Sequence, residues 1–131
     1  MTEKELCTMA IKATENAYAP YSGYKVGAAL LTKSGKVYSG CNIENASYSP
    51  TNCAERTAFF KAISEGEREF LAIAIAGGKN GEIKDVFPPC GVCRQVMSEF
   101  CSKDFKVLLV KNEEDFEIYT LCQLIPLAFE F

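Results

Sequence analysis

The chain begins with apolar residues at helical spacing, and the pattern then changes to strand-like segments. The first stripe predicts an amphipathic helix from Glu3 to about Ala19, ended by Pro20. Two β-rich segments flank Ser34-Gly35 and predict an antiparallel hairpin. The stripe of the first helix consists of Leu6, Met9, Ala10, Ala13 and Ala17.

The rest of the chain alternates helical and extended patterns. A continuous apolar run from Phe70 to Ala76 predicts a strand buried on both faces, and the Gly-, Asn-, Asp- and Pro-rich segment 77–89 predicts a loop. Residues 1–131 are therefore expected to form one α/β domain, with a mixed sheet and helices on both faces. The other expected elements are strands at Val26–Leu31, Lys36–Cys41, Lys106–Val110 and Glu117–Thr120, and helices at Cys53–Ser64, Cys90–Cys101 and Leu121–Ile125.

Size and charge exclude several classes of protein. With 131 residues and a net charge of −3, the chain has room for one core and no overall basic field to hold a phosphate backbone, so a nucleic-acid partner is disfavoured. The start lacks the pattern of a secretory signal, and no apolar run approaches the roughly 20 residues of a membrane span. We expect a cytoplasmic protein with no membrane association.

The chain has seven cysteines and no histidine, so any soft metal must be held by thiolates. In the cytoplasm thiols stay reduced, which favours metal ligands and buried free thiols over disulfides. Cys7, Cys41, Cys101 and Cys122 have no partner at a motif spacing, and we expect all four to be small buried side chains.

The other three cysteines lie in two motifs, Cys53-Ala54-Glu55 and Pro89-Cys90-Gly91-Val92-Cys93. Three thiolates fill three corners of a zinc tetrahedron and leave the fourth for water, which is the ligand count of a catalytic site. Glu55 is the candidate base for that water. A structural zinc site completed by another cysteine, a redox Cys-x-x-Cys pair, or no metal at all are the alternatives, and the added Cys-Ala-Glu and Pro-Cys elements favour catalysis.

Both motifs lie where a loop gives way to a helix, which places the sulfurs at two helix N-termini. Glu55 is about 200° around the helix from Cys53, so it reaches the same ion only if the ion lies over the helix end. Three thiolates around Zn²⁺ leave a net negative charge, which Arg56 could offset. Alternatively, Arg56 is a solvated helix residue.

The chain resembles the short, homotetrameric class of cytidine deaminases. The resemblance covers nearly the whole chain in the order expected. Its motifs are Tyr18-Ala19-Pro20-Tyr21-Ser22, the hairpin strand 26–31, the segment 40–48, Cys53-Ala54-Glu55-Arg56-Thr57-Ala58, the segment 89–96 and the C-terminal Leu-Ile-Pro-x-Ala-Phe.

This resemblance implies a three-layer α/β/α sandwich around a five-stranded mixed sheet, with one Zn²⁺ per subunit held by Cys53, Cys90 and Cys93. It implies hydrolytic deamination of cytidine and deoxycytidine to uridine and deoxyuridine with release of ammonia, in pyrimidine salvage. Glu55 would carry protons from the attacking water to ring N3 and to the leaving amine. Arg56 would support the metal site.

The resemblance also assigns the nucleoside site. Asn42 and Glu44 would hold the ribose, although these residues considered alone read as a turn residue and a surface charge. Phe129 and Tyr48 would belong to sites shared between subunits of a homotetramer, the alternative for Phe129 being that the apolar C-terminus covers its own core. Two positions depart from the family pattern. Tyr24 stands where the family usually has Phe, and Leu127 stands where it often has Gly. The implied substrate-binding residues are Asn42, Ile43, Glu44, Tyr24, Ala54, Tyr48 and Phe129.

Three rival functions are distinguishable. Deaminases of a nucleoside-like antibiotic such as blasticidin S carry similar cysteine motifs, but the run Asn42–Ala46 favours cytidine. A nucleic-acid deaminase needs basic surface, which this acidic chain lacks overall. A non-catalytic, zinc-stabilised binding module would tolerate the loss of Glu55.

Overall fold

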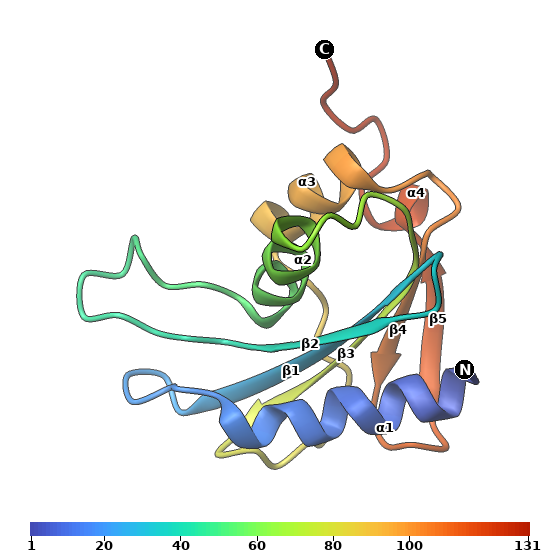
Figure 1. The fold of residues 1–131 in the computed structure, drawn as a ribbon. Coiled ribbons are helices and arrows are strands. Elements are labelled where there is room, and N and C mark those ends of the chain that lie inside the picture. The colour runs from blue at the N-terminus through green and yellow to red at the C-terminus, as the bar shows by residue number, and fades with distance from the viewer.

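Five strands form a single mixed sheet in the order β2-β1-β3-β4-β5 in the computed structural model, which describes all 131 residues (Figure 1). β1 pairs antiparallel with both β2 and β3, β3 pairs parallel with β4, and β4 pairs antiparallel with β5. The predicted five-stranded mixed sheet is confirmed. The strands are β1 (Tyr24–Thr32), β2 (Val37–Cys41), β3 (Phe70–Lys79), β4 (Lys106–Val110) and β5 (Phe116–Thr120).

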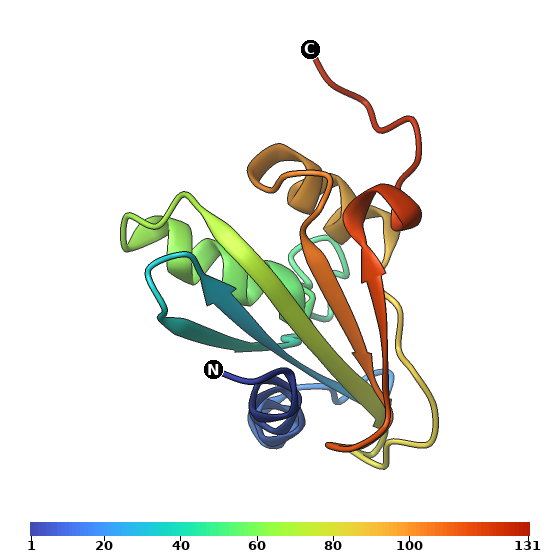
Figure 2. The same cartoon turned by 90° about the vertical axis from the view of Figure 1, so that its right-hand side faces the viewer.

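Helices cover both faces of this sheet, as the view in Figure 2 shows. On one face lie α1 (Glu3–Ala13) and the 3₁₀ turn η1 (Thr14–Asn16), and on the other α2 (Ala54–Ser64), α3 (Gly91–Phe100) and α4 (Leu121–Leu124). Each side has its own apolar cluster, the larger one between the sheet and α2 and α3. The predicted three-layer α/β/α sandwich is therefore confirmed, and none of its helices combines the length and apolar character needed to cross a bilayer.

Two predicted boundaries were wrong. α1 ends at Ala13 rather than near Ala19, because the chain tightens into η1 and the Thr14 hydroxyl donates to the Ile11 carbonyl. β3 runs to Lys79, and residues 77–79, predicted as loop, pair with the first residues of β1. Gly77 and Gly78 are typical of a loop when only the local sequence is considered. In the structure, backbone pairing with the neighbouring strand β1 keeps them in an extended conformation.

The prediction for the four remaining cysteines was only partly right. Cys7 is fully buried, Cys41 and Cys101 are half-buried, and Cys122 is exposed, so Cys122 does not fit the expectation. No cysteine of the chain is in a disulfide.

Gly40 allows α2 to lie directly on β2. A Cβ atom at this position would collide with the Ala54 carbonyl oxygen and the Ala58 amide nitrogen of α2. Because Gly40 has no side chain, α2 can approach β2 closely at this point. This contact positions the N-terminus of α2, which carries the first cysteine motif.

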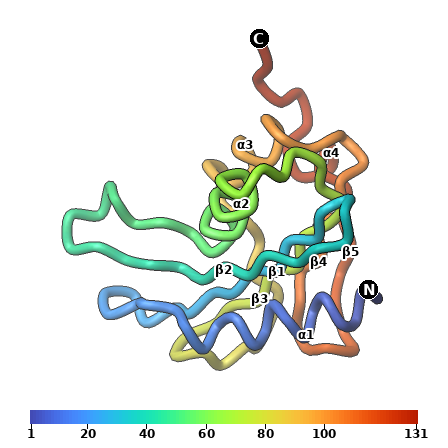
Figure 3. Tube along the Cα trace, in the orientation of Figure 1, coloured from blue at the N-terminus to red at the C-terminus, as the bar shows by residue number.

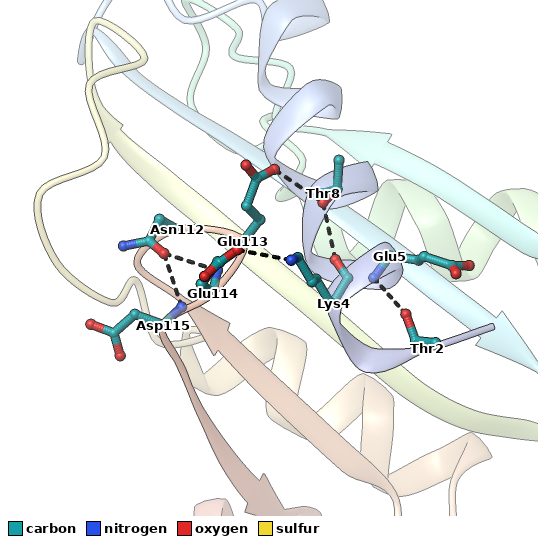
Figure 4. A network of polar contacts seen from close by, with 8 residues as sticks. All are labelled: Thr2, Lys4, Glu5, Thr8, Asn112, Glu113, Glu114 and Asp115. Carbon is teal, nitrogen blue, oxygen red and sulfur yellow. Dashed lines mark hydrogen bonds and ion pairs between the residues drawn. The ribbon is translucent and has the colours of Figure 1, made fainter.

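The opposite helix, α1, is tied to the turn between β4 and β5 by polar contacts (Figure 4). The Lys4 ammonium lies 2.8 Å from the Glu114 carboxylate, and the Thr8 hydroxyl donates to Glu113 at 3.3 Å. Asn112 accepts hydrogen bonds from the backbone of Glu114 and Asp115, which shapes the turn. These groups are exposed, so the contacts fix the position of α1 without adding much stability.

Candidate active site

The structure brings the sulfurs of Cys53, Cys90 and Cys93 together, within 4.8 Å of one another. Cys53 is the N-cap of α2 and Cys90 the N-cap of α3, while Cys93 lies in the first turn of α3. The Sγ atoms of Cys53 and Cys90 are 3.7 Å apart. Two ligands of a tetrahedral zinc with Zn–S bonds of about 2.3 Å are separated by about 3.8 Å, so these side chains fit one zinc ion.

Arg56 adds a positive charge to this thiol cluster. Its Nη2 lies 3.2 Å from Cys53 Sγ, and its Nε is buried without a hydrogen-bond acceptor in the chain. The alternative of a solvated helix residue is thus not what the structure shows. A hydrogen bond from Cys93 and the guanidinium of Arg56 lower the pKa of Cys53 to about 5, which favours the thiolate form that binds metal.

Glu55 lies in the first turn of α2 and is only 4% exposed. Burial raises the pKa of its carboxyl to about 7. Because Cys53 precedes the helix as its N-cap, Glu55 and Cys53 line the same cavity although they point different ways around the helix axis. A metal ion over the helix end could therefore meet both the sulfur and water held by the carboxylate.

The cavity next to the sulfurs has a volume of about 330 Å³, within the range of small-molecule sites. It lies where the start of β1, the end of β2 and the N-termini of α2 and α3 meet. In Figure 3 the β2–α2 connection, in teal and green, and the segment before β1, in light blue, both extend beyond the sheet at this end. The predicted site residues in its lining are Tyr24, Asn42, Glu44, Cys53, Ala54, Glu55 and Cys90.

Asn42 is the polar side chain at the end of β2, and its amide is oriented by β1. Its Oδ1 accepts from the Val26 amide at 2.9 Å, and its Nδ2 donates to the Tyr24 carbonyl at 2.7 Å. One amide hydrogen and one lone pair remain for a ligand. Asn42 is therefore not a simple turn residue, because its side chain is fixed by two hydrogen bonds at the edge of the cavity.

Glu44 is held by the turn that precedes β1. Its Oε1 accepts from the backbone amides of Tyr21 and Ser22 at 2.9 and 3.1 Å, and its Oε2 accepts from the Ser22 hydroxyl. The pKa of Glu44 is lowered, chiefly by the hydrogen bond from the Ser22 hydroxyl. A carboxylate has about four acceptor sites, so one remains, on Oε2, for a donor on a ligand.

Phe87 and Ser22 are among the lining residues of this cavity that were not predicted as site residues from the sequence. Phe87 lies in the segment before α3, and its ring centroid is 6.0 Å from that of Tyr24, so the two rings form a wall. Ser22 was noted within a motif but not assigned a role. An aromatic residue directly before Pro88-Pro89-Cys90 was the available signal for Phe87, whereas nothing local predicts the contact between Ser22 and Glu44.

Three of the predicted substrate-binding residues lie outside this cavity. The Ile43 side chain is 47% exposed, and its backbone pairs with Asn52. Tyr48 is 75% exposed and lines a second hollow with Glu44. Phe129 is 67% exposed on the C-terminal segment, which projects away from the sheet and helices in Figure 1.

Leu127 has φ +53°, a left-handed conformation that glycine adopts without strain. Its side chain is fully exposed. Leu127 therefore adopts the backbone conformation that the usual glycine favours, and a leucine pays a conformational cost for it.

A thiolate metal site beside a buried carboxylate defines this protein as a metal-dependent hydrolytic enzyme. The family model for the cytidine and deoxycytidylate deaminase zinc-binding region matches residues 1–109. A cytidine deaminase from Sporosarcina psychrophila is 50% identical over 129 residues, covering 98% of this chain and 92% of that protein. The crystal structure of cytidine deaminase from Burkholderia pseudomallei matches with a TM-score of 0.90 and 49% identity, covering 98% of this chain and all of that one.

The chain belongs to the cytidine and deoxycytidylate deaminase family, whose shared region binds zinc. A blasticidin-S deaminase from Bacillus cereus is a more distant relative, 32% identical over 123 residues that cover 89% of this chain and 86% of that protein.

Proposed function

We propose that this enzyme deaminates cytidine and deoxycytidine hydrolytically to uridine and deoxyuridine, with release of ammonia, as a step of pyrimidine salvage. The observation that carries the proposal is the position of Glu55, a buried carboxyl group that lines one small cavity together with Cys53 and Cys90. Close relatives over nearly the full chain are cytidine deaminases, which supports the choice of substrate.

Cys53, Cys90 and Cys93 hold one zinc ion per chain, with Arg56 offsetting the charge of the thiolates. Zinc in such a site supplies Lewis acidity that makes water nucleophilic near neutral pH. The net negative charge of three thiolates around zinc would make water harder to ionise. The Arg56 guanidinium, which contacts Cys53, offsets part of that negative charge.

Glu55 performs the proton transfers. It takes a proton from the water that attacks C4 of the pyrimidine and delivers one to ring N3, which converts C4 to a tetrahedral carbon. It then takes the remaining proton from the new C4 hydroxyl and passes it to the amino group as the C4–N bond breaks, so that ammonia leaves and the carbonyl of uridine forms. Its burial keeps bulk water from competing for these protons.

Asn42 and Glu44 bind the sugar. The unused hydrogen-bonding capacity of each side chain matches a hydroxyl group, which donates one hydrogen bond to Glu44 and accepts one from Asn42. Tyr24 and Phe87 provide the apolar wall, and Ala54 also lines the cavity. Ile43 lies outside the lining and supports the site through its backbone pairing with Asn52, which lines the cavity.

The active enzyme is a homotetramer in which Tyr48 and Phe129 complete sites shared between subunits. The support is their exposure together with the apolar tail, in which the Phe129 and Phe131 rings pack edge to face at 5.5 Å. A tail with so little polar cover is typical of an interface. Each subunit is one catalytic domain spanning residues 1–131 and works in the cytoplasm, where free thiols persist, without a nucleic-acid or membrane partner.

The test is the decrease in absorbance when purified enzyme converts cytidine, with zinc measured on the same sample. Zinc-loaded wild type is expected to turn over cytidine and deoxycytidine, and Glu55→Ala to keep its zinc and assembly while losing nearly all turnover. Blasticidin S is the competing substrate in a parallel reaction. Turnover of blasticidin S alone would transfer the assignment to that activity, and full activity in Glu55→Ala would overturn the proton-transfer role.

A further inference from the structure

The hydrogen bonds to the Glu44 carboxylate described above all come from the turn before β1. Tyr21 and Ser22 supply two backbone amides and one hydroxyl, so the position of the carboxylate depends on the conformation of this turn. The turn lies before the sheet begins and is exposed in part. A local hydrogen bond, from the Gly23 amide to the Ala19 carbonyl at 2.9 Å, holds the turn, and it has a second support from elsewhere in the fold.

That support comes from the end of β3, 57 residues further along the chain. Lys79 Nζ donates to the Ser22 carbonyl at 2.7 Å and lies 5.2 Å from the centroid of the Tyr24 ring. The Asn80 amide donates to the Gly23 carbonyl at 2.6 Å. One ammonium thus contacts both residues that flank Gly23, and the adjacent backbone amide binds Gly23 itself.

Gly23 leaves room for this arrangement. Its φ is +75°, and a Cβ atom there would lie 3.1 Å from Lys79 Nζ and 3.2 Å from its Cε. The lysine side chain therefore packs over the face of the turn that a larger residue would occupy. It does not extend freely into solvent, which is the usual state of a surface lysine.

We propose that Lys79 is a positioning residue for sugar recognition, which holds the turn 21–23 in the conformation that presents Glu44 to a sugar hydroxyl. This role rests on the proposed nucleoside deamination. Lys79 does not reach the cavity lining itself, so it acts through Ser22 and Glu44. Its positive charge also favours the ionised form of Glu44, after the larger effect of the Ser22 hydroxyl on the pKa of that group.

The experiment compares Lys79→Met with Lys79→Arg in the zinc-loaded enzyme. Methionine keeps the length and apolar stem but removes the donor and the charge, so the KM for cytidine is expected to rise roughly five-fold with kcat within about two-fold of wild type. Arginine keeps the charge, the donor and the contact with the Tyr24 ring and is expected to restore KM. Lys84→Met, an equal charge change at an exposed residue of the following segment, is the matched control.

A substrate lacking the sugar hydroxyl separates positioning from general damage to the cavity. With 2′,3′-dideoxycytidine, which has no 3′-hydroxyl for Glu44, the KM ratio of Lys79→Met to wild type is expected to be close to one. An unchanged KM for cytidine, or an equal increase for both substrates, would overturn the proposal while leaving the deaminase activity established. Wild-type enzyme inactive on cytidine would instead overturn the proposed function and this role with it.

Discussion

The guanidinium of Arg56 lies 3.2 Å from the sulfur of Cys53, one helical turn earlier on the same chain. In a site with three thiolate ligands and no histidine, this contact is the nearest source of positive charge apart from the two helix N-termini. Arg56 and Cys53 belong to the same motif, so we infer that this guanidinium offsets the negative charge of an all-cysteine site.

Replacing Arg56 should therefore weaken the metal site more than the fold. For Arg56→Ala we expect a loss of roughly 10- to 100-fold in zinc affinity or activity, the usual cost of removing a group that supports a metal ligand. Zinc competition with a chromophoric chelator, followed by the cytidine assay, measures both. Arg68→Ala, which removes an exposed arginine in the connection between α2 and β3, is the control. Equal zinc affinity and activity in Arg56→Ala and wild type would contradict the role.

Removing one metal ligand should cost both zinc and stability. In Cys90→Ala only two thiolates remain between α2 and α3, so we expect zinc content to fall close to zero and the Tm to decrease. Removing zinc from wild type with a chelator should lower its Tm in the same direction. Cys122→Ala removes an exposed cysteine away from the cluster and should keep its zinc. A full complement of zinc in Cys90→Ala would mean that the ion is held elsewhere.

The lowered pKa of Glu44 predicts a measurable change when Ser22 loses its hydroxyl. Ser22 is the main cause of the shift, and Lys79 is the charged group that adds to it. Glu44 should therefore titrate below the ordinary value of about 4.3 in wild type and closer to it in Ser22→Ala. Its stabilising effect is present above the unfolded pKa and is lost as pH falls through the folded one, so Ser22→Ala should be less stable than wild type near neutral pH, and the difference in stability should shrink in acid.

Carbon-13 NMR of the Glu44 carboxyl, assigned with Glu44→Gln, measures this titration directly. Ser98→Ala, which removes a hydroxyl bonded only to its own helix, should leave the Glu44 midpoint unchanged. Identical Glu44 midpoints in Ser22→Ala and wild type would show that the hydroxyl does not set the pKa.

The metal cluster could be predicted from sequence because its information is local. Cys90 and Cys93 share a helix face by their spacing, and Cys53 and Cys90 both precede a helix, so helix geometry alone brings the candidates to helix N-termini. The order of the strands was not available locally, but the alternation of helices and strands limited the architecture to few arrangements.

The support of the sugar site could not be predicted in the same way. Lys79 lies in a segment whose glycines are typical of a loop, and its contact with Ser22, 57 residues away, depends on β3 pairing with β1. Phe87 meets Tyr24 for a similar reason, since the connection after β3 has no periodic pattern to fix where its side chains point. The positions of the Lys79 and Phe87 side chains depend on contacts between distant segments of the chain, which the local sequence does not indicate.

Subunit mixing tests whether active sites are shared. In the proposed homotetramer, Glu55→Ala and Phe129→Ala should each be weakly active, because every site lacks one group. If Phe129 serves a neighbouring site, random exchange of the two chains should restore roughly a quarter of the sites, those that take Glu55 from one variant and Phe129 from the other. The measurement is cytidine turnover before and after dissociation and reassembly of an equimolar mixture, with light scattering to follow the tetramer.

A second mixture provides the control, because Glu55 and Asn42 line the same cavity within one chain. Mixing Glu55→Ala with Asn42→Ala should bring no gain, since neither chain can supply what the other lacks. No gain in the Phe129 mixture would mean that this aromatic serves its own chain. In that case the projecting tail must fold back onto its own subunit, and the Gln95 side chain, which donates to the Phe129 carbonyl at 3.3 Å, marks where it is already held.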